Sequence, residues 1–381
     1  MKIALAHELL TMKGGAERVL RIAADMFPEA PVYTLLYDEK KLGDWFPAHR
    51  VVSATLPLPY SLLPAPYRLN HHLHLRHFPR AVEQWDFSQY DVVLSFSSAF
   101  MHGIITNRAP RHVCYVHSPA RYLWDRTHDV LDRAGHGMLG AIRRQYMERT
   151  FHRLRIWDAE TAARPDKLLA ASREVQRRIQ LYWRRDAEVV YPPINEEWLT
   201  TPHSPLPTPN PNPNPNPTPY FFIASTLVPY KRIDLAIHAC NALKLPLKIA
   251  GEGPERRRLE QISGPTIAFL GHQIAAQLRE LYTNAKATIF PGDEDFGLVP
   301  LESMACGTPV IAYGSGGALE TVIEGKTGTF FGEPTADSLQ KKLKEFDQNL
   351  YTKENGQKQA RCFGETKFRQ KITHALEAVL R

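Results

Sequence analysis

The feature that most constrains the fold of this chain is the alternation of short apolar strands with segments of helical periodicity. In the first half we expect strands at Lys2–Ala6, Asp91–Ser95, His112–Val116 and Lys167–Ala170, and a helix at Gly15–Asp25. In the second half we expect strands at Tyr220–Ala224, Leu247–Ala250, Thr266–Leu270, Ala287–Phe290 and Pro309–Ala312, separated by helices at Ile233–Leu243, Glu255–Ile262, Ala275–Asn284 and Pro300–Cys306. This order is typical of α/β proteins, in which helices cover both faces of a parallel sheet.

A proline-rich stretch at residues 202–219 separates the two halves. Proline lacks a backbone donor and disfavours helix in the residue before it, so an extended linker or loop is expected here. We therefore predict an N-terminal domain over residues 1–201 and a C-terminal domain over residues 220–362. Both are expected to be doubly wound, Rossmann-like domains that face each other across a cleft, with ligands at the carboxyl ends of the strands.

Composition indicates a reduced compartment. The chain has four cysteines that are far apart and form no CxxC pair, namely Cys114, Cys240, Cys306 and Cys362. This argues against a structural zinc site and against a disulfide framework. No apolar run approaches the roughly 18 residues of a spanning helix, and Met1–Leu10 carries His7 and Glu8, which suits a buried strand better than a signal sequence. A cytoplasmic protein is expected.

Positive charge is concentrated in part of the N-terminal half. The formal net charge is +7, and many of the arginines lie between Arg143 and Arg185. One interpretation is a set of solvated helix faces. The other is a surface for anionic groups, including contact with the cytoplasmic face of the membrane. Because no nucleic-acid-binding module is visible, a nucleic acid is not expected as a partner.

The segment PGDEDFGLVPLE, residues 291–302, carries the most specific chemistry. Its helix is expected to begin near Val299 or Pro300, so unpaired amides and a positive dipole would lie at its start. A diphosphate could bind the amides of Phe296, Gly297 and Leu298. Glu294 would then face a sugar, and Glu302 could accept hydrogen bonds from ribose hydroxyls. A surface loop with two solvated acids is the alternative for the two carboxylates taken alone.

Neighbouring segments support a phosphate site. Lys231 lies in the loop after a predicted strand, where a phosphate-binding cation is expected. Glycine-rich turns follow two further strands, at residues 251–253 and 314–317; for residues 251–253 a tight strand-to-helix turn without ligand contact is an equal alternative. The consecutive acids Asp293, Glu294 and Asp295 point in different directions, so no metal site is expected.

Taken in order, the segments LVPYK, GEGP, FLG and PGDEDFGLVPLESMACGTPVIAYGSGG resemble family 4 of the retaining glycosyltransferases, and the resemblance runs through nearly the whole chain. It implies the two-domain GT-B fold and transfer of a sugar from a nucleotide-sugar donor. Glu294 and Glu302 match the Glu-x7-Glu element of that family. The resemblance also implies that the last segment, residues 363–381, forms a helix that crosses back to the N-terminal domain; a C-terminal helix on its own domain is the alternative.

The N-terminal half agrees with this resemblance. Gly14 and Gly15 match the glycine loop that approaches the donor diphosphate, and His117, directly after a strand, matches a histidine that contacts the donor sugar and assists at the reacting centre. The following residues of HSPARYLWD are candidates for an acceptor wall: Arg121, Tyr122, Trp124 and Asp125. Packing is an equal alternative for Tyr122 and Trp124.

The resemblance implies a metal-independent reaction in which Lys231 and the helix-start amides stabilise the departing diphosphate. The patterns HSPARYLWD, ASREVQRRI and VVYPPI resemble bacterial mannosyltransferases of polysaccharide biosynthesis, so GDP-mannose is favoured over UDP-sugars, with a glycan or lipid-linked acceptor. No cofactor is expected besides the donor.

One position departs from the family. Members usually carry an arginine five residues before the loop lysine, and this chain has Thr226 there. A hydroxyl brings no charge to a phosphate, and charge-assisted bonds are about twice as strong as neutral ones. A non-catalytic sugar-nucleotide-binding protein, or a subunit of a partner transferase, therefore stays an alternative. Another GT-B enzyme such as an epimerase is a second alternative, and a dehydrogenase is disfavoured because no GxGxxG follows the first strand.

Overall fold

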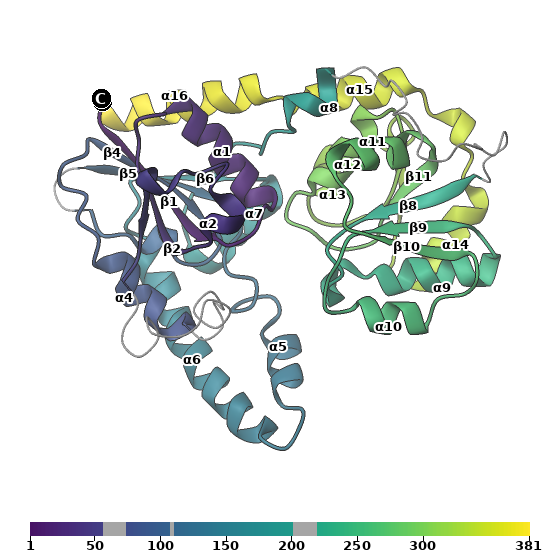
Figure 1. The fold of residues 1–381 in the computed structure, drawn as a ribbon, viewed down its shortest axis with the longest axis horizontal. Helices are drawn as coiled ribbons and strands as arrows, with labels where there is room; N and C mark the ends of the chain where they lie inside the picture. The colour runs from purple at the N-terminus through teal and green to yellow at the C-terminus, as the bar shows by residue number, and fades with distance from the viewer. Residues whose placement is uncertain (56–73, 107–109, 201–218) are drawn as a thin grey trace. The chain divides into compact units, whose positions relative to one another are not determined.

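The computed structural model describes residues 1–55, 74–106, 110–200 and 219–381. Residues 202–218 of the predicted linker lie outside these ranges. The described chain divides into two compact units, the first made of Met1–Tyr191 and Thr366–Arg381 and the second of Pro192–Glu365 (Figure 1).

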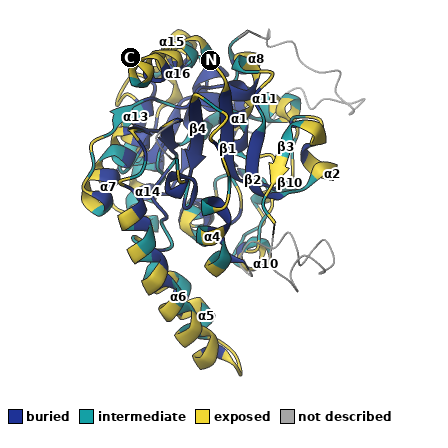
Figure 2. Ribbon diagram, turned by 90° about the vertical axis from the view of Figure 1, so that its left-hand side faces the viewer, coloured by how far each residue is buried: buried dark blue, intermediate teal, exposed yellow. Residues whose placement is uncertain are grey.

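The first unit is built on a fully parallel seven-stranded sheet of order β3-β2-β1-β4-β5-β6-β7. Its strands are β1 (Ile3–Leu10), β2 (Val32–Tyr37), β3 (Val51–Ser53), β4 (Val92–Ser97), β5 (Arg111–Val116), β6 (Lys167–Ala170) and β7 (Glu188–Val189). Its main helices are α1 (Gly15–Met26), α2 (Glu39–Leu42), α4 (Phe78–Glu83), α5 (Thr127–Ala134), α6 (Gly140–Thr161) and α7 (Arg173–Trp183). The central strands are buried along almost their whole length, as Figure 2 shows, because helices cover both faces of the sheet.

The second unit has a parallel six-stranded sheet of order β10-β9-β8-β11-β12-β13. Its strands are β8 (Tyr220–Ala224), β9 (Leu247–Ala250), β10 (Ile267–Gly271), β11 (Ala285–Phe290), β12 (Val310–Tyr313) and β13 (Gly328–Phe331). Its helices are α8 (Glu196–Thr200), α9 (Ile233–Leu243), α10 (Arg256–Gln261), α11 (Ala275–Thr283), α12 (Leu298–Ala305), α13 (Ala318–Thr321), α14 (Ala336–Glu345) and α15 (Lys353–Arg361). The predicted class, two Rossmann-like α/β domains, is confirmed.

Strand order reverses at one point in each sheet. In the first unit the chain runs outward from β1 in one direction and from β4 in the other, and in the second unit from β8 and from β11. Ligands of open parallel sheets bind beyond the carboxyl ends of the strands at such a switch point. The loops after β1, β4, β8 and β11 are therefore the places to look for a site.

The last helix, α16 (Glu365–Leu380), begins in the second unit and is counted with the first from Thr366 on. Phe368, Ile372 and Leu376 are buried in the same apolar core as the sheet of the first unit. The ring of Phe368 meets Tyr115 of β5 edge-on, with 5.7 Å between ring centroids.

Candidate functional site

An ion pair marks the switch point of the second unit. Lys231 ends a short 3₁₀ helix (Pro229–Lys231) after β8, and Glu294 lies in the loop after β11. Lys231 Nζ is 2.5 Å from Glu294 Oε1, and each side chain is 17% exposed. The structure thus brings together two residues that are far apart in the sequence and were both predicted as site residues.

Glycines let the loops around this pair approach each other. A Cβ atom on Gly292 would lie 3.0 Å from the Cα of Lys231, and one on Gly317 would lie 2.1 Å from the Cα of Phe296. The Gly317 amide donates to the Glu294 carbonyl at 2.8 Å. Gly316 has a positive φ of 59°, which glycine adopts without strain. The turn after β12 therefore supports the backbone of the Glu294 loop.

Helix α12 begins one residue after a sharp backbone turn. Gly297 has a φ of 83° and precedes Leu298, the first helical residue, so the helix starts slightly earlier than the expected Val299 or Pro300. Phe296 is buried and packs against Phe363 with 5.6 Å between ring centroids. The backbone of Phe296, Gly297 and Leu298 thus forms the N-terminal end of the helix, where amides lack intrahelical acceptors and the dipole is positive.

Glu302 lies one turn into α12 and is mostly buried. The hydroxyl of Tyr282, at the end of α11, donates to Glu302 Oε2 at 3.2 Å. Tyr282 is completely buried. Sequence reasoning missed this partner because Tyr282 appears only as an apolar position of a helix; the pairing of α11 with α12 is tertiary.

Thr226 is exposed in the loop after β8. Its carbonyl accepts hydrogen bonds from the Ser225 hydroxyl and the Val228 amide. Arg232, next to Lys231, pairs with Asp234 at 3.2 Å. Its guanidinium is therefore engaged at the start of α9.

In the first unit, a buried carboxylate links the glycine segment to β1. Gly14 caps α1 and Gly15 is its first residue, so only Gly14 belongs to the loop. The Gly14 amide donates to Glu17 Oε2 at 2.9 Å, and Glu17 Oε1 lies 3.4 Å from His7 Nε2. A Glu three residues after a helix cap is a recognised signal of capping. The contact of Glu17 with His7 has no such signal, because it depends on how α1 packs against β1.

His117 directly follows β5, and its amide donates to the Ser97 carbonyl at the end of β4. Its Nε2 atom is buried without a hydrogen-bond partner among the described residues. Burial, with a smaller contribution from nearby His7, lowers the pKa of His117 to about 3. The imidazole is therefore neutral near pH 7 and has a nitrogen available for a polar ligand.

Glu8, also on β1, occupies the turn after β4. Its Oε1 atom accepts hydrogen bonds from the amides of Ser98, Ala99 and Phe100, the first at 2.8 Å and the last at 2.6 Å. Consecutive amides of this kind commonly bind anions. Here an internal carboxylate already satisfies them, so this turn is not a candidate phosphate site.

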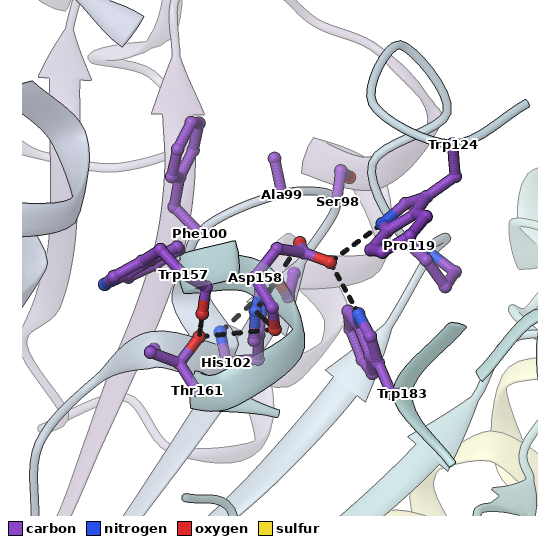
Figure 3. A network of polar contacts seen from close by, with 12 residues as sticks. Ser98, Ala99, Phe100, His102, Pro119, Trp124, Trp157, Asp158, Thr161 and Trp183 are labelled. Atoms are coloured by element: carbon purple, nitrogen blue, oxygen red, sulfur yellow. Dashed lines mark hydrogen bonds and ion pairs between the residues drawn. The ribbon is translucent and has the colours of Figure 1, made fainter. Parts of the chain in front are cut away.

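The predicted acceptor residues are held by contacts within the first unit. Trp124 Nε1 donates to Asp158 Oδ2 at 2.9 Å, and Trp183 Nε1 donates to the same oxygen at 2.6 Å (Figure 3). The Trp124 ring also stacks on Tyr182, with centroids 4.9 Å apart. Trp124 is thus fixed in place between α6 and α7.

The other three acceptor candidates lie around it. Asp125 accepts a hydrogen bond from Tyr182 and pairs with Arg178 at 3.2 Å and with Arg121 at 3.4 Å. The Tyr122 hydroxyl is buried without a hydrogen-bond partner in the described structure, and burial raises its pKa well above the ordinary value. This segment therefore holds Asp125 by internal contacts and also contains one buried polar group, the Tyr122 hydroxyl, that has no hydrogen-bond partner among the described residues.

Asp158 is the buried centre of this network (Figure 3). Burial raises its pKa to about 7, although the two tryptophan N–H groups favour the ionised form. His102 Nε2 lies 3.2 Å from the Asp158 carbonyl oxygen, and His102 Nδ1 lies 3.2 Å from the Ser97 hydroxyl. Asp158 was not predicted, because nothing in its sequence neighbourhood distinguishes it from a solvated helix residue.

Two features are absent from the part of the chain that the structure describes, a metal-binding cluster and a membrane-spanning helix. Within the ranges that the structure describes, no group of three or more histidine, cysteine or acidic side chains is arranged to hold a metal ion. In the same ranges, every helix is too short or too polar to cross a membrane.

Comparison with known proteins connects this site to a family. Residues 208–362 match the family model described as Glycosyl transferases group 1. A GDP-mannose-dependent alpha-(1-6)-phosphatidylinositol monomannoside mannosyltransferase of Mycolicibacterium smegmatis is 33% identical over 133 residues, which cover 30% of this chain and 35% of that protein. An uncharacterised glycosyltransferase of Methanocaldococcus jannaschii is 25% identical over 189 residues, covering 48% and 50%. The chain thus spans half or less of the length of these curated relatives.

Solved structures are similar over the whole chain. HepE of Anabaena, solved in complex with UDP, has a TM-score of 0.70 at 18% identity and covers 99% of this chain and 100% of its own. Sucrose-phosphate synthase of Thermosynechococcus elongatus has a TM-score of 0.73 at 16% identity, covering 100% and 99%. The predicted resemblance to GT-B glycosyltransferases is confirmed. Residues 208–362, which hold Lys231, Glu294 and the start of α12, match the model of the group 1 glycosyl transferases, and the chain has the two-domain fold of GT-B glycosyltransferases.

Proposed function

We propose that the chain is a retaining, metal-independent glycosyltransferase that moves a sugar from a nucleotide-sugar donor to a glycan or lipid-linked acceptor. The observation that carries this proposal is the Lys231–Glu294 pair at 2.5 Å, beside the start of α12 at a topological switch point. The pair combines a cation for a diphosphate with a carboxylate for sugar hydroxyls. The amides of Phe296, Gly297 and Leu298 add an anion-binding helix end.

The proposed reaction breaks the bond between the anomeric carbon and the diphosphate and forms a bond from that carbon to an acceptor oxygen. The acceptor proton passes to the departing phosphate oxygen on the same face, which preserves the anomeric configuration. Lys231 and the helix-start amides stabilise the charge that develops on the diphosphate. Glu302, oriented by Tyr282, accepts hydrogen bonds from the ribose.

We assign the N-terminal residues their predicted roles as proposals. His117, neutral near pH 7, contacts the transferred sugar with a nitrogen that has no internal hydrogen-bond partner. Gly14 and Gly15 contact the donor diphosphate. Arg121, Tyr122, Trp124 and Asp125 line the acceptor side. A cytoplasmic location with contact between the basic N-terminal half and the membrane face completes the proposal.

GDP-mannose is the donor we favour, because several relatives are named as GDP-mannose-dependent mannosyltransferases. The complexes of HepE with UDP and with UDP-glucose support a uridine donor as the competing choice. Thr226, exposed where the family usually has an arginine, favours a second candidate function: a sugar-nucleotide-binding protein without transfer activity.

The first experiment measures thermal stability with GDP, UDP, GDP-mannose and UDP-glucose, each with and without a chelator. A ligand that binds only the folded protein, at 100 times its dissociation constant, adds about 2.7 kcal/mol of stability. We expect a rise in Tm with guanosine ligands that the chelator does not change. A response to uridine ligands alone would reassign the base, and a response abolished by chelator would contradict metal independence.

The same thermal assay, together with a measurement of the transfer rate, tests the site in variants. Glu302→Ala should remove the ligand-induced rise in Tm, and Lys231→Ala should lower the rate of transfer about 100-fold or more, because a charge-stabilising donor is lost. Lys341→Ala, on the exposed surface of α14, is the control and should change neither. Ligand binding without transfer to any glycan or lipid acceptor would support the non-catalytic candidate.

A further inference from the structure

A helical hairpin formed by α5 and α6 projects from the body of the first unit in both views (Figures 1 and 2). Its outer turn is tight. The Gly140 amide donates to the Gly137 carbonyl at 2.9 Å, and Gly137 has a φ of 84°. A Cβ atom on Gly140 would lie 1.9 Å from the Gly135 carbonyl oxygen. The turn is therefore compact, and its two remaining residues, Met138 and Leu139, are left on the outside.

Large apolar side chains at this end are exposed. Met138 is 101% exposed, Leu139 58%, Ile142 67% and Tyr146 50%. Leu139, Ile142 and Tyr146 are spaced three and four residues apart, so they share one face of α6. Contiguous exposed apolar surface of this kind marks an interaction site on a soluble protein.

The same face becomes basic nearer the base of the hairpin. Arg149 and Arg153 continue the spacing of Ile142 and Tyr146, and both are exposed. Residues 127–157 contain six arginines and three acidic residues. Two of those acids, Asp132 and Glu148, are paired with Arg144 at 2.9 and 3.0 Å. The hairpin surface therefore carries an excess of positive charge behind an apolar end.

The base of α6 is fixed in the first unit. Phe151 and Leu154 are buried in an apolar cluster, and Asp158 receives hydrogen bonds from Trp124 and Trp183. The opposite face of α6 packs against α5. The exposed apolar residues thus lie at the outer end of a helix whose base is anchored in the core. They are held in place by this helix, which an unfolded segment would not do.

We propose that the outer end of this hairpin inserts into the headgroup region of an anionic lipid bilayer. Met138, Leu139, Ile142 and Tyr146 would enter the boundary between headgroups and acyl chains, and Arg149 and Arg153 would bind lipid phosphates. Interfacial helices combine these two features, an apolar face and basic residues beside it. This proposal names the surface for the membrane contact included in the proposed function, and it holds whether or not the chain transfers a sugar.

A second copy of the chain fits the same surface less well. If two α6 helices paired side by side in parallel, Arg149 and Arg153 would face their own counterparts. If they paired in antiparallel fashion, the arginines of one helix would face the apolar residues of the other. A bilayer meets both parts of the surface at once, because its acyl chains lie below its phosphates.

The test uses vesicles and the full chain without any donor. Sedimentation with vesicles of phosphatidylcholine containing about one-third phosphatidylglycerol should retain the protein, and vesicles of phosphatidylcholine alone should retain it about tenfold less. The variant Met138→Ser, Leu139→Ser, Ile142→Ser should lower partitioning to the anionic vesicles about tenfold. Arg149→Glu with Arg153→Glu should lower it similarly and remove the difference between the two lipids.

Matched controls separate this surface from general stickiness. Ile274→Ser with Leu350→Ser changes residues of the second unit that are 60% and 69% exposed, and it should bind vesicles like the wild type. Because the changed hairpin side chains are exposed, circular dichroism and Tm should also be unchanged. In a Cys362→Ser background, an environment-sensitive dye at Met138→Cys should shift to the blue with anionic vesicles, whereas the dye at Leu350→Cys should not.

Three results would overturn the proposal. They are no retention of the wild type by anionic vesicles, equal retention of the serine triple variant, and an unshifted dye at position 138 while the protein is bound. If light scattering showed a wild-type dimer that the triple variant abolishes, without vesicle binding, the surface would instead be an interface between copies. Donor-induced changes in Tm do not enter this test, so its outcome is independent of that of the nucleotide experiment.

Discussion

Two carboxylates in this chain show how the surroundings of a residue decide its chemistry. Glu294 has Lys231 as a cationic partner at 2.5 Å. Asp158 Oδ2 receives neutral donors, the indole N–H groups of Trp124 and Trp183, and its other oxygen, Oδ1, is buried without a hydrogen-bond partner in the described structure. His102 Nε2 lies 3.6 Å from Oδ1, but burial lowers the pKa of His102 to about 3, so this ring is not a cation near pH 7. Burial disfavours a charge that lacks a counter-ion, so the pKa of Asp158 is raised to about 7. Glu294 is therefore suited to bind a ligand, and Asp158 is suited to hold Trp124 and Trp183 in place.

The raised pKa of Asp158 predicts a pH-dependent stability. Because the folded-state pKa is above the unfolded one, the folded protein binds a proton more tightly, and this stabilisation is present at low pH and lost as pH rises through 7. Asp158→Asn keeps an oxygen for the two tryptophans and removes the titration. We expect the Tm of the wild type, relative to that of Asp158→Asn, to fall by several degrees between pH 5 and pH 8. Scanning calorimetry of both proteins checks this, and a constant difference across that range would contradict it.

At the scale of elements, the site depends on glycine turns whose backbone packs closely against neighbouring loops because glycine has no side chain. The turn at residues 314–317 lies against the loop that carries Glu294, through the Gly317 amide and the close approach of Gly317 to Phe296. Ser315 adds a hydrogen bond to Asp293 at 3.2 Å. Placing Glu294 therefore requires β12 and its turn as well as β11.

This packing predicts that Gly317→Ala weakens the donor site. Gly317 has a φ of −66°, which alanine adopts readily, so the effect would come from the new Cβ atom 2.1 Å from the Phe296 Cα. We expect a loss of roughly 1–3 kcal/mol of stability, typical of overpacking, and a smaller donor-induced rise in Tm. Gly332→Ala is the control, since its Cβ would meet nothing within 4 Å. If the two variants behaved alike, the contact would not matter.

At the scale of the whole molecule, the chain returns to its first unit after building the second. Helix α16 places Phe368, Ile372 and Leu376 in the core that also contains β5 and β6. The first unit is therefore complete only when the last residues of the chain are present. The stability of the first unit therefore depends on the packing of α16.

The return of α16 predicts a local effect of Ile372→Ala. Ile372 is completely buried, and removing its side chain should cost about 2–5 kcal/mol. Hydrogen exchange should show faster exchange in β5 and β6 and unchanged exchange in β8 and β11. Leu380→Ala, on the same helix but 43% exposed, should leave all four strands as they are. Equal effects on both units would show that α16 does not belong to the first unit alone.

Much of the local structure was predictable because its causes are local. Strand and helix periodicity located β1, β4, β5, β6 and the strands β8 to β12, and the expected start of α12 near Val299 or Pro300 lies one or two residues after its observed first residue, Leu298. The resemblance carried by Glu294, Glu302 and Lys231 pointed to the correct fold. The strands β2, β3, β7 and β13 were not predicted. Three of them, β3, β7 and β13, are edge strands of two to four residues, too short to show a period. The internal strand β2 is a short continuous apolar run, which periodicity alone does not distinguish from a buried helix segment.

What the sequence by itself determined is the set of elements and the chemical character of the loops after them, because both follow from neighbouring residues. Tertiary structure alone decided which side chains meet: Lys231 with Glu294, Tyr282 with Glu302, and Trp124 with Asp158. Such partners depend on strand order and on the packing of distant helices, which side-chain periodicity does not encode. Tertiary structure also left the end of the α5–α6 hairpin uncovered, because burial depends on what the rest of the fold places against a helix.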